Sequence, residues 1–131
     1  MAWEVEFTDE FEEWWNGLKE TEQIKIDVAI RMLEEYGSDL PYPMSSGVSG
    51  SRHSHMRELR IQVYGKPFRV LYAFNPKRAA VLLAGGDKTG DERWYEVNVP
   101  KAEKLYDQHI EDLKKEDELK RRAKKERPKH G

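Results

Sequence analysis

The 131-residue sequence contains no cysteine, which excludes a disulfide framework and a thiolate metal site. It also lacks any apolar run near the roughly 20 residues of a membrane-spanning helix, and its N-terminus lacks the basic-then-apolar pattern of a secretory signal. These absences predict a soluble protein of the cytoplasm that does not contact a membrane. The length is close to the commonest domain size, so we expect one domain large enough to bury its own core.

The net charge is also small, at −2, but the charges are strongly segregated along the chain. Residues 1–39 carry 12 Asp/Glu against 3 Lys/Arg, residues 52–78 carry 7 Lys/Arg against one acid, and residues 114–131 carry 9 Lys/Arg against 4 acids. A basic face of this kind suits nucleic acid, because cations displace the counterions of phosphates. Charge alone leaves open the alternative that these are solvated faces without a ligand.

The first forty residues predict a strand followed by two helices. Alternating apolar residues over 3–8 indicate a strand with one buried face. Asp9, with Glu12 in capping-box position, is the expected N-cap of the first helix, and Thr21 is the expected N-cap of the second. The second helix has an apolar stripe at helical spacing and is expected to end at Gly37 in a left-handed conformation. The stripe consists of Ile26, Ala29, Ile30 and Leu33.

Residues 38–55 are rich in turn-forming residues and predict a long loop, which in a compact domain is either mobile or functional. Three strands are predicted after this loop. In the first two, apolar residues alternate with polar ones, so Arg60 and Arg69 are expected on the face opposite the apolar side chains. The third, over 79–84, is apolar on both faces, as in a central strand. The alternating apolar residues are Leu59, Ile61 and Val63, then Phe68, Val70, Tyr72 and Phe74.

A further helix is predicted after Pro100, a residue suited to the first helical turn, and it continues past Leu113. Beyond that point almost no apolar residues remain, so the basic extension is expected to fray. We therefore expect a domain over residues 1–113 and an extension over 114–131. The order of elements (strand, two helices, three or more strands, helix) predicts an α+β fold, with an antiparallel sheet and the helices against one face.

Four segments carry a resemblance to a known family: RELR (57–60), FRVLYAF (68–74), VLLAGGDKTG (81–90) and RWYEVNVPKAEKLYDQH (93–109). In their order and spacing, the chain resembles the HigB-like branch of the RelE/ParE toxin superfamily, in the group of phage-derived Gp49-like proteins. The resemblance implies the RelE-like fold, a small antiparallel sheet with two N-terminal helices and a C-terminal helix. It also implies a toxin that cleaves mRNA in the ribosomal A site.

The resemblance further implies the partners. These are the ribosome with its mRNA and a small helix-turn-helix antitoxin (HigA-like). The toxin is therefore expected as a monomer or as part of a toxin–antitoxin hetero-oligomer. No cofactor is expected.

Cleavage of RNA without a metal has three requirements. A group must take the 2′-hydroxyl proton, cations must stabilise the transition state, and a donor must serve the leaving 5′-oxygen. The four histidines have no carboxylates nearby at ligand spacing, so no metal site is predicted and fixed cations are the available stabilisers. Arginine suits this role because its planar fork binds phosphate in a bidentate way and stays charged.

Carried over by position, the resemblance assigns Arg60 and Arg69 to the substrate phosphates and Lys88 to the catalytic cation of the glycine-rich loop. Tyr95 lies near a family tyrosine implicated in proton transfer. To act as a base, it requires its pKa, ordinarily about 10, to be lowered by cations such as Lys88 or Arg93. Further RNA contacts are expected at Arg57, Arg93 and Trp94.

The cations also have structural interpretations. Arg60 and Arg69 could be strand residues that pair with Glu58 or Asp91. Lys88 could be an ordinary turn lysine beside an aspartate.

The aromatic and histidine side chains have alternatives of the same kind. Trp94 and Tyr95 could be core or interface aromatics rather than platforms on which bases stack. His53 and His55 are expected at the surface of the long loop, with a general-base role as the alternative.

Two other functions stay open for the chain. One is a non-nuclease toxin that binds DNA gyrase, as in the ParE branch. The other is an inactive phage-derived protein that binds RNA or an antitoxin without cutting. The basic extension is open as well, because it either strengthens attachment to ribosomal RNA through counterion release or is a solvated helix.

Overall fold

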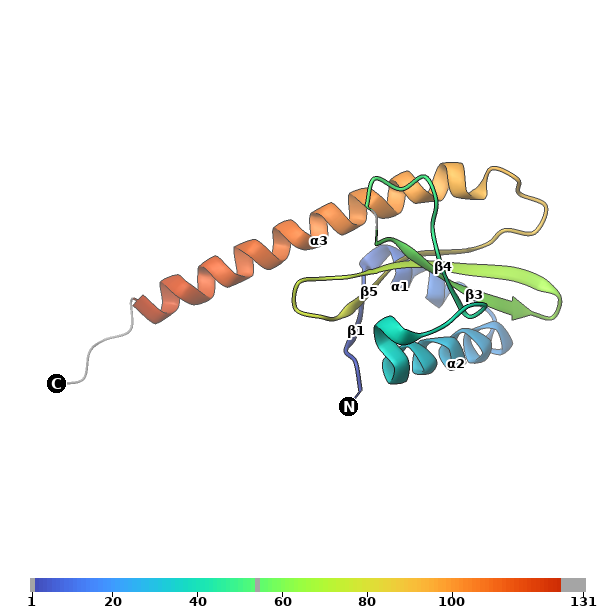
Figure 1. Ribbon diagram of the computed structural model, residues 1–131, viewed down its shortest axis with the longest axis horizontal. Helices are drawn as coiled ribbons and strands as arrows, with labels where there is room; N and C mark the ends of the chain where they lie inside the picture. The colour runs from blue at the N-terminus through green and yellow to red at the C-terminus, as the bar shows by residue number, and fades with distance from the viewer. Residues whose placement is uncertain (1, 54, 126–131) are drawn as a thin grey trace.

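The computed structural model describes residues 2–53 and 55–125. Its centre is a five-stranded sheet with helices on both faces (Figure 1). None of the helices in this part of the chain combines the length and the apolar character that crossing a membrane requires. In chain order the elements are β1 (Val5–Phe7), α1 (Asp9–Asn16), α2 (Glu20–Tyr36), the short 3₁₀ helix η1 (Gly37–Asp39), β2 (Ser45–Gly47), β3 (Arg57–Val63), β4 (Lys66–Phe74), β5 (Ala80–Asp87) and α3 (Trp94–Lys125).

The strands lie in the order β1-β5-β4-β3-β2. β3, β4 and β5 form an antiparallel meander and β2 adds to it antiparallel, whereas β1 runs parallel to β5. The α+β class is confirmed, with its two N-terminal helices and its C-terminal helix. The expectation of a wholly antiparallel sheet is wrong for β1. This strand starts beside the start of β5, where Ala80 pairs with Val5 and donates its N–H to the carbonyl of Glu4.

The helices cover both faces of the sheet, and not one face as expected (Figure 1). α1 and α2 pack on one face, and α3 packs on the other. The physical reason is that β4 and β5 are apolar on both sides, so the second face also needs a cover. The side chains buried beneath α3 include Leu71, Ala73, Val81 and Leu83.

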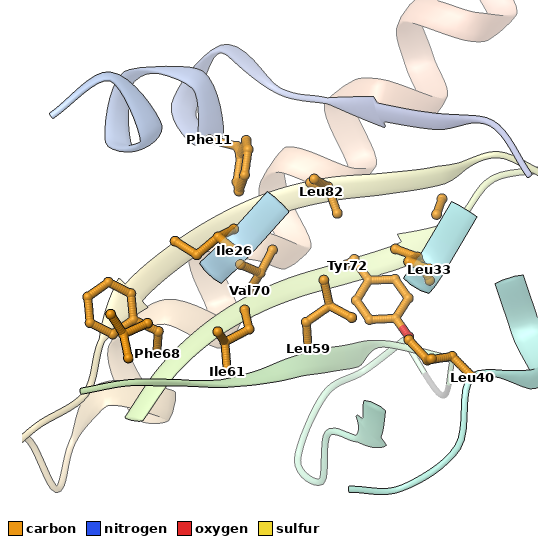
Figure 2. Packing of buried hydrophobic residues seen from close by; sticks show 12 residues of the cluster. Phe11, Ile26, Leu33, Leu40, Leu59, Ile61, Phe68, Val70, Tyr72 and Leu82 are labelled. Carbon is orange, nitrogen blue, oxygen red and sulfur yellow. The ribbon is translucent and has the colours of Figure 1, made fainter. Parts of the chain in front are cut away.

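The face toward α2 holds the alternating apolar residues that the sequence predicts. Figure 2 shows Ile26 and Leu33 of α2 packed against side chains of β3, β4 and β5. The predicted stripe of α2 is confirmed, because Ile26 and Leu33 are fully buried and Ala29 and Ile30 are partly buried against the same cluster. The strand residues of this cluster are Leu59, Ile61, Val63, Phe68, Val70, Tyr72, Ala80 and Leu82.

Two adjacent glycines in β5 allow a tryptophan to pack on each face of the strand. A Cβ added at Gly85 would overlap the ring of Trp14 in α1. A Cβ added at Gly86 would lie 2.5 Å from the Nε1 of Trp94, the first residue of α3. Such distances are shorter than van der Waals contact, so both positions require glycine for this approach of helix to sheet.

The helix caps differ from those predicted. Thr8, and not Asp9, caps α1: its hydroxyl accepts the N–H of Phe11 at 3.1 Å and donates to the carbonyl of Leu83 at 2.8 Å. The N-cap of α2 is Lys19 rather than Thr21. Lysine is a poor cap by side-chain chemistry, which explains the wrong prediction. The end of α2 at Gly37, with a φ of +53°, is as predicted.

The C-terminal helix is much longer than predicted. α3 begins at Trp94, so Pro100 lies inside it rather than in its first turn. The extension does not fray over the described residues, because α3 is helical to Lys125; residues 126–131 lie outside them. Ion pairs one turn apart, Glu116 with Lys120 and Glu118 with Arg122, support this charged segment. In Figure 1 the far end of α3 projects beyond the sheet.

The contact between Gly86 and Trp94 predicts the effect of Gly86→Ala. The added methyl group overlaps the indole, so the free energy of unfolding is expected to fall by about 1–3 kcal/mol in urea titrations. Gly17→Ala is the control, since Gly17 has a φ of −84° and its added Cβ would lie 3.6 Å from the carbonyl oxygen of Trp14, an ordinary van der Waals contact. Equal stability of the two variants would contradict the proposed constraint at Gly86.

Candidate functional site

Arg60 and Arg69 lie directly opposite each other on neighbouring strands. The register pairs Arg60 of β3 with Arg69 of β4, and Arg69 in turn with Gly86 of β5. Both side chains are on the face that α3 covers, so the prediction that they share a face is confirmed. Like charges directly opposite each other in a sheet repel, so this pair requires a compensating group.

The two guanidinium groups differ in exposure. Arg69 is only 3% exposed; its Nη1 donates to the carbonyl of Phe68 at 2.9 Å and its Nε donates to the hydroxyl of Tyr95 at 3.3 Å. The side chain of Arg60 is 33% exposed, and its guanidinium lies over the ring of Tyr42. Arg60 is therefore the more accessible of the two guanidinium groups, whereas Arg69 is held in place by its contacts.

Glu58 is the compensating group. Its Oε1 lies 3.1 Å from Nη1 of Arg60 and 3.6 Å from Nε of Arg69. The residue is 4% exposed, and its Oε2 has no hydrogen-bond partner among the described residues. The sequence pattern alone presents Glu58 only as a pairing partner of the arginines. The signal that marks it is its position as the one acid of the basic stretch 52–78, on the same strand face as Arg60.

Tyr95 sits at the start of α3, beside the arginine pair. Burial raises the pKa of its phenol, the nearby carboxylate of Glu58 raises it further, and the hydrogen bond from Arg69 opposes these effects. The lowered pKa that a general base requires is therefore not found. A phenol that keeps its proton at neutral pH is suited to donate a hydrogen bond or a proton instead.

Lys88 completes the group from the loop between β5 and α3. Its backbone N–H donates to the carbonyl of Pro67 at 3.0 Å, which ties the loop to β4. Its Nζ lies 5.3 Å from the ring centroid of Tyr95, as in a cation–π contact. Asp87, the aspartate beside Lys88 in this turn, accepts the N–H of Thr89 at 3.0 Å. We call these five residues (Glu58, Arg60, Arg69, Lys88 and Tyr95) the cationic site.

Three other predicted RNA-binding residues lie outside the cationic site. Arg57 is on the opposite face of β3, where its Nε donates to the Ser45 hydroxyl at 2.9 Å. Trp94 is 4% exposed and packs in the core beneath α3, so it is no stacking platform. Arg93 is exposed and pairs with Glu96 at 3.0 Å.

The long loop contributes a second cluster of polar side chains, which fastens it to α3. Both the hydroxyl of Ser51 and the backbone N–H of Arg52 donate to the carboxylate of Glu103, at 3.1 and 2.6 Å. The carboxylate of Asp107 pairs with the guanidinium of Arg52 and, at 3.0 Å, with Nε2 of His53. We call residues 51–53 the strap.

The two loop histidines are far from the cationic site. His55 is 3.4 Å from the hydroxyl of Tyr106, which donates to the carbonyl of Phe74 at 2.8 Å. Phe74 lies five residues along β4 from Arg69, about 17 Å at the rise of a strand. The strap therefore holds α3 at one end of the sheet while the cationic site occupies the other.

The fold is that of the toxin RelE. A double arginine-to-alanine variant of Escherichia coli RelE in the free state matches with a TM-score of 0.52 and 15% identity, over 73% of this chain and 94% of that one. The family model described as phage derived protein Gp49-like matches residues 13–107. The chain therefore belongs to the Gp49-like family and has the fold of RelE.

Two curated relatives from Mycobacterium tuberculosis (strain ATCC 25618 / H37Rv) are described as candidate toxins. HigB2 is 36% identical over 114 residues, which is 86% of this chain and 57% of HigB2. HigB3 is 40% identical over 93 residues, which is 70% of this chain and 80% of HigB3. The chain thus spans little more than half the length of HigB2.

Removal of the Glu58 charge is expected to destabilise the protein. Glu58→Gln leaves Arg69 buried without its carboxylate, and breaking such a pair costs about 3–5 kcal/mol of unfolding free energy. Glu96→Gln, which removes a carboxylate from the exposed pair with Arg93, is the control, with an expected loss below about 1 kcal/mol. Adding Arg69→Met to Glu58→Gln should recover part of the loss. Equal losses in Glu58→Gln and in the control would exclude this role of Glu58.

The strap makes stability depend on pH. The hydrogen bond from Arg52 holds the pKa of Asp107 below its usual 3.8, and His53 adds to this. When folding lowers the pKa of a carboxyl group, the charged group stabilises the folded protein at pH values above its unfolded-state pKa. This stabilisation is lost as the pH falls through the folded-state pKa. Asp107→Asn should therefore destabilise the protein at neutral pH, and the difference should shrink at acidic pH in urea titrations. The control is Asp112→Asn, because Asp112 is a carboxylate of α3 that does not contact the strap. A stability difference between wild type and Asp107→Asn that does not change with pH would contradict the prediction.

Proposed function

We propose that the protein is the toxin of a type II toxin–antitoxin pair and cleaves translated mRNA on the ribosome without a metal. The observation that carries this is the cationic site, in which two arginines flank a buried carboxylate and a lysine lies over the ring of Tyr95. Family membership supports the toxin assignment. The proposed place of action is the cytoplasm, and the proposed partner is a HigA-like helix-turn-helix antitoxin.

In the proposed reaction the 2′-oxygen of a ribose attacks the adjacent phosphorus and the bond from phosphorus to the 5′-oxygen breaks. This leaves a 2′,3′-cyclic phosphate and a 5′-hydroxyl. Arg60 and Lys88 stabilise the charge that gathers on the phosphate oxygens, and Arg69 holds its position through contacts that are already made. When a phosphate draws Arg60 away from Glu58, the carboxylate is free to take the proton of the 2′-hydroxyl. Tyr95 donates its proton to the leaving 5′-oxygen, a role that fits its raised pKa.

The exposure of Arg60 and Lys88 makes them the clearest residues for mutation. On induction, wild type is expected to arrest growth and to produce new 5′ ends within translated transcripts. Arg60→Ala and Lys88→Ala should each lower the cleavage rate on the order of a hundredfold, as loss of one preorganised donor does in other enzymes. Tyr95→Phe should also slow cleavage while the protein stays folded. Lys25→Ala, on the helix that covers the other face of the sheet, is the control.

The same experiment distinguishes the competing functions. Intact transcripts in arrested wild-type cells would overturn the nuclease assignment, and inhibition of purified DNA gyrase would then favour a ParE-like toxin. Binding to ribosomes without new 5′ ends would favour an inactive RNA-binding protein. Equal cleavage by wild type and Arg60→Ala would place the chemistry elsewhere on the molecule.

A further inference from the structure

The last turns of α3 project beyond the sheet (Figure 1). Residues 114–125 carry seven Lys/Arg against three acids, and from Leu119 to Lys125 there are five Lys/Arg and no acid. We call residues 114–125 the basic arm. It lies beyond the region that the family model matches, so the function of the cationic site does not account for it. The cations from Leu119 onward are Lys120, Arg121, Arg122, Lys124 and Lys125.

The three acidic residues of the basic arm all form ion pairs. Glu116 and Glu118 each pair with a cation four residues later, at 3.2 and 3.4 Å. Asp117 pairs with Lys77 of the β4–β5 turn at 3.0 Å, which braces the arm against the sheet. Three cations near the tip (Arg121, Lys124 and Lys125) make no ion pair with any described residue. The arm is thus braced at its base, and positive charge at its end is not paired with an acid among the described residues.

The distance between the arm and the cationic site restricts the ligand. Tyr95 of the cationic site lies in the first turn of α3, and Lys125 lies 30 residues further, about 45 Å along a helix axis. Four stacked nucleotides span only about 14 Å at 3.4 Å per nucleotide. A short RNA bound at Arg60 therefore cannot reach the tip. A ligand that contacts both ends must present phosphates tens of ångströms apart, as a large folded RNA does.

We propose that the basic arm is a second RNA-binding element that binds phosphates of ribosomal RNA at a distance from the site of cleavage. This proposal rests on the proposed function and deepens it, because it assigns the attachment to the ribosome to a part of the chain outside the cationic site. Each phosphate contact releases counterions, so the arm adds affinity that weakens as salt concentration rises. It carries no sequence information, and it increases the time that the toxin stays bound.

The test measures binding of the full-length protein to purified bacterial 70S ribosomes over a series of salt concentrations. The triple variant Arg121→Gln/Lys124→Gln/Lys125→Gln should bind at least tenfold more weakly at about 100 mM salt. The slope of log affinity against log salt should become shallower by about 2–3, from 0.7–0.9 for each of three lost contacts. The matched control removes the same charge elsewhere, through Lys25→Gln/Arg31→Gln/Lys104→Gln, and should keep the wild-type slope.

A second measurement identifies the class of the ligand. A benzophenone side chain in place of Ala123 should crosslink to ribosomal RNA. Crosslinks to ribosomal protein alone would overturn the proposal. So would arm-dependent binding to anionic vesicles in place of ribosomes. Equal weakening in both triple variants, or unchanged binding by the arm variant, would overturn it as well. Wild type that binds no ribosomes would remove the proposed function, and the role of the arm with it, which separates that failure from failure of the arm alone.

Discussion

The contact of two tryptophans with two adjacent glycines sets the spacing of the whole molecule. Trp14 packs on one face of β5 at Gly85, and Trp94 packs on the other face at Gly86. The close approach brings α1 and α3 down onto the same strand from opposite sides. Because Trp94 is followed in the helix by Tyr95, seating the indole also places the phenol within hydrogen-bond distance of Arg69. The packing that completes the core therefore assembles the cationic site.

The electrostatics of the cationic site are costly for stability. Two arginines face each other across neighbouring strands, and one of them is buried with a carboxylate whose second oxygen has no partner among the described residues. Apolar side chains of similar volume would often stabilise such a layer at least as well. The proposed function would account for the arrangement, because a charge such as that of Arg69, held in place before the substrate arrives, needs no reorganisation during the reaction. A group like Glu58 is therefore expected where function outweighs stability.

Much of the fold follows from local patterns in the sequence. The two-residue period of β3 and β4 predicts which residues face α2, and it also places Arg60 and Arg69 together. The same period separates Arg57 from Arg60, which are three residues apart on one strand. The start of α3 is not predictable from local sequence, because Pro100 resembles a first-turn residue and the role of Trp94 depends on Gly86 in the preceding strand. The burial of Arg69 and the raised pKa of Tyr95 arise from tertiary contacts, which no local pattern contains.

The strap links the long loop to the lifetime of the assembled site. α3 is held by the sheet beneath it and, through Glu103 and Asp107, by residues 51–53 at its side. Proteins open in contiguous cooperative units, so we expect α3 to separate from the sheet only when its contacts with the strap break. Trp94 and Tyr95 belong to the same helix, and their departure would leave Arg69 without its phenol partner. The contacts of a loop at the other end of the sheet would then govern how often the cationic site comes apart.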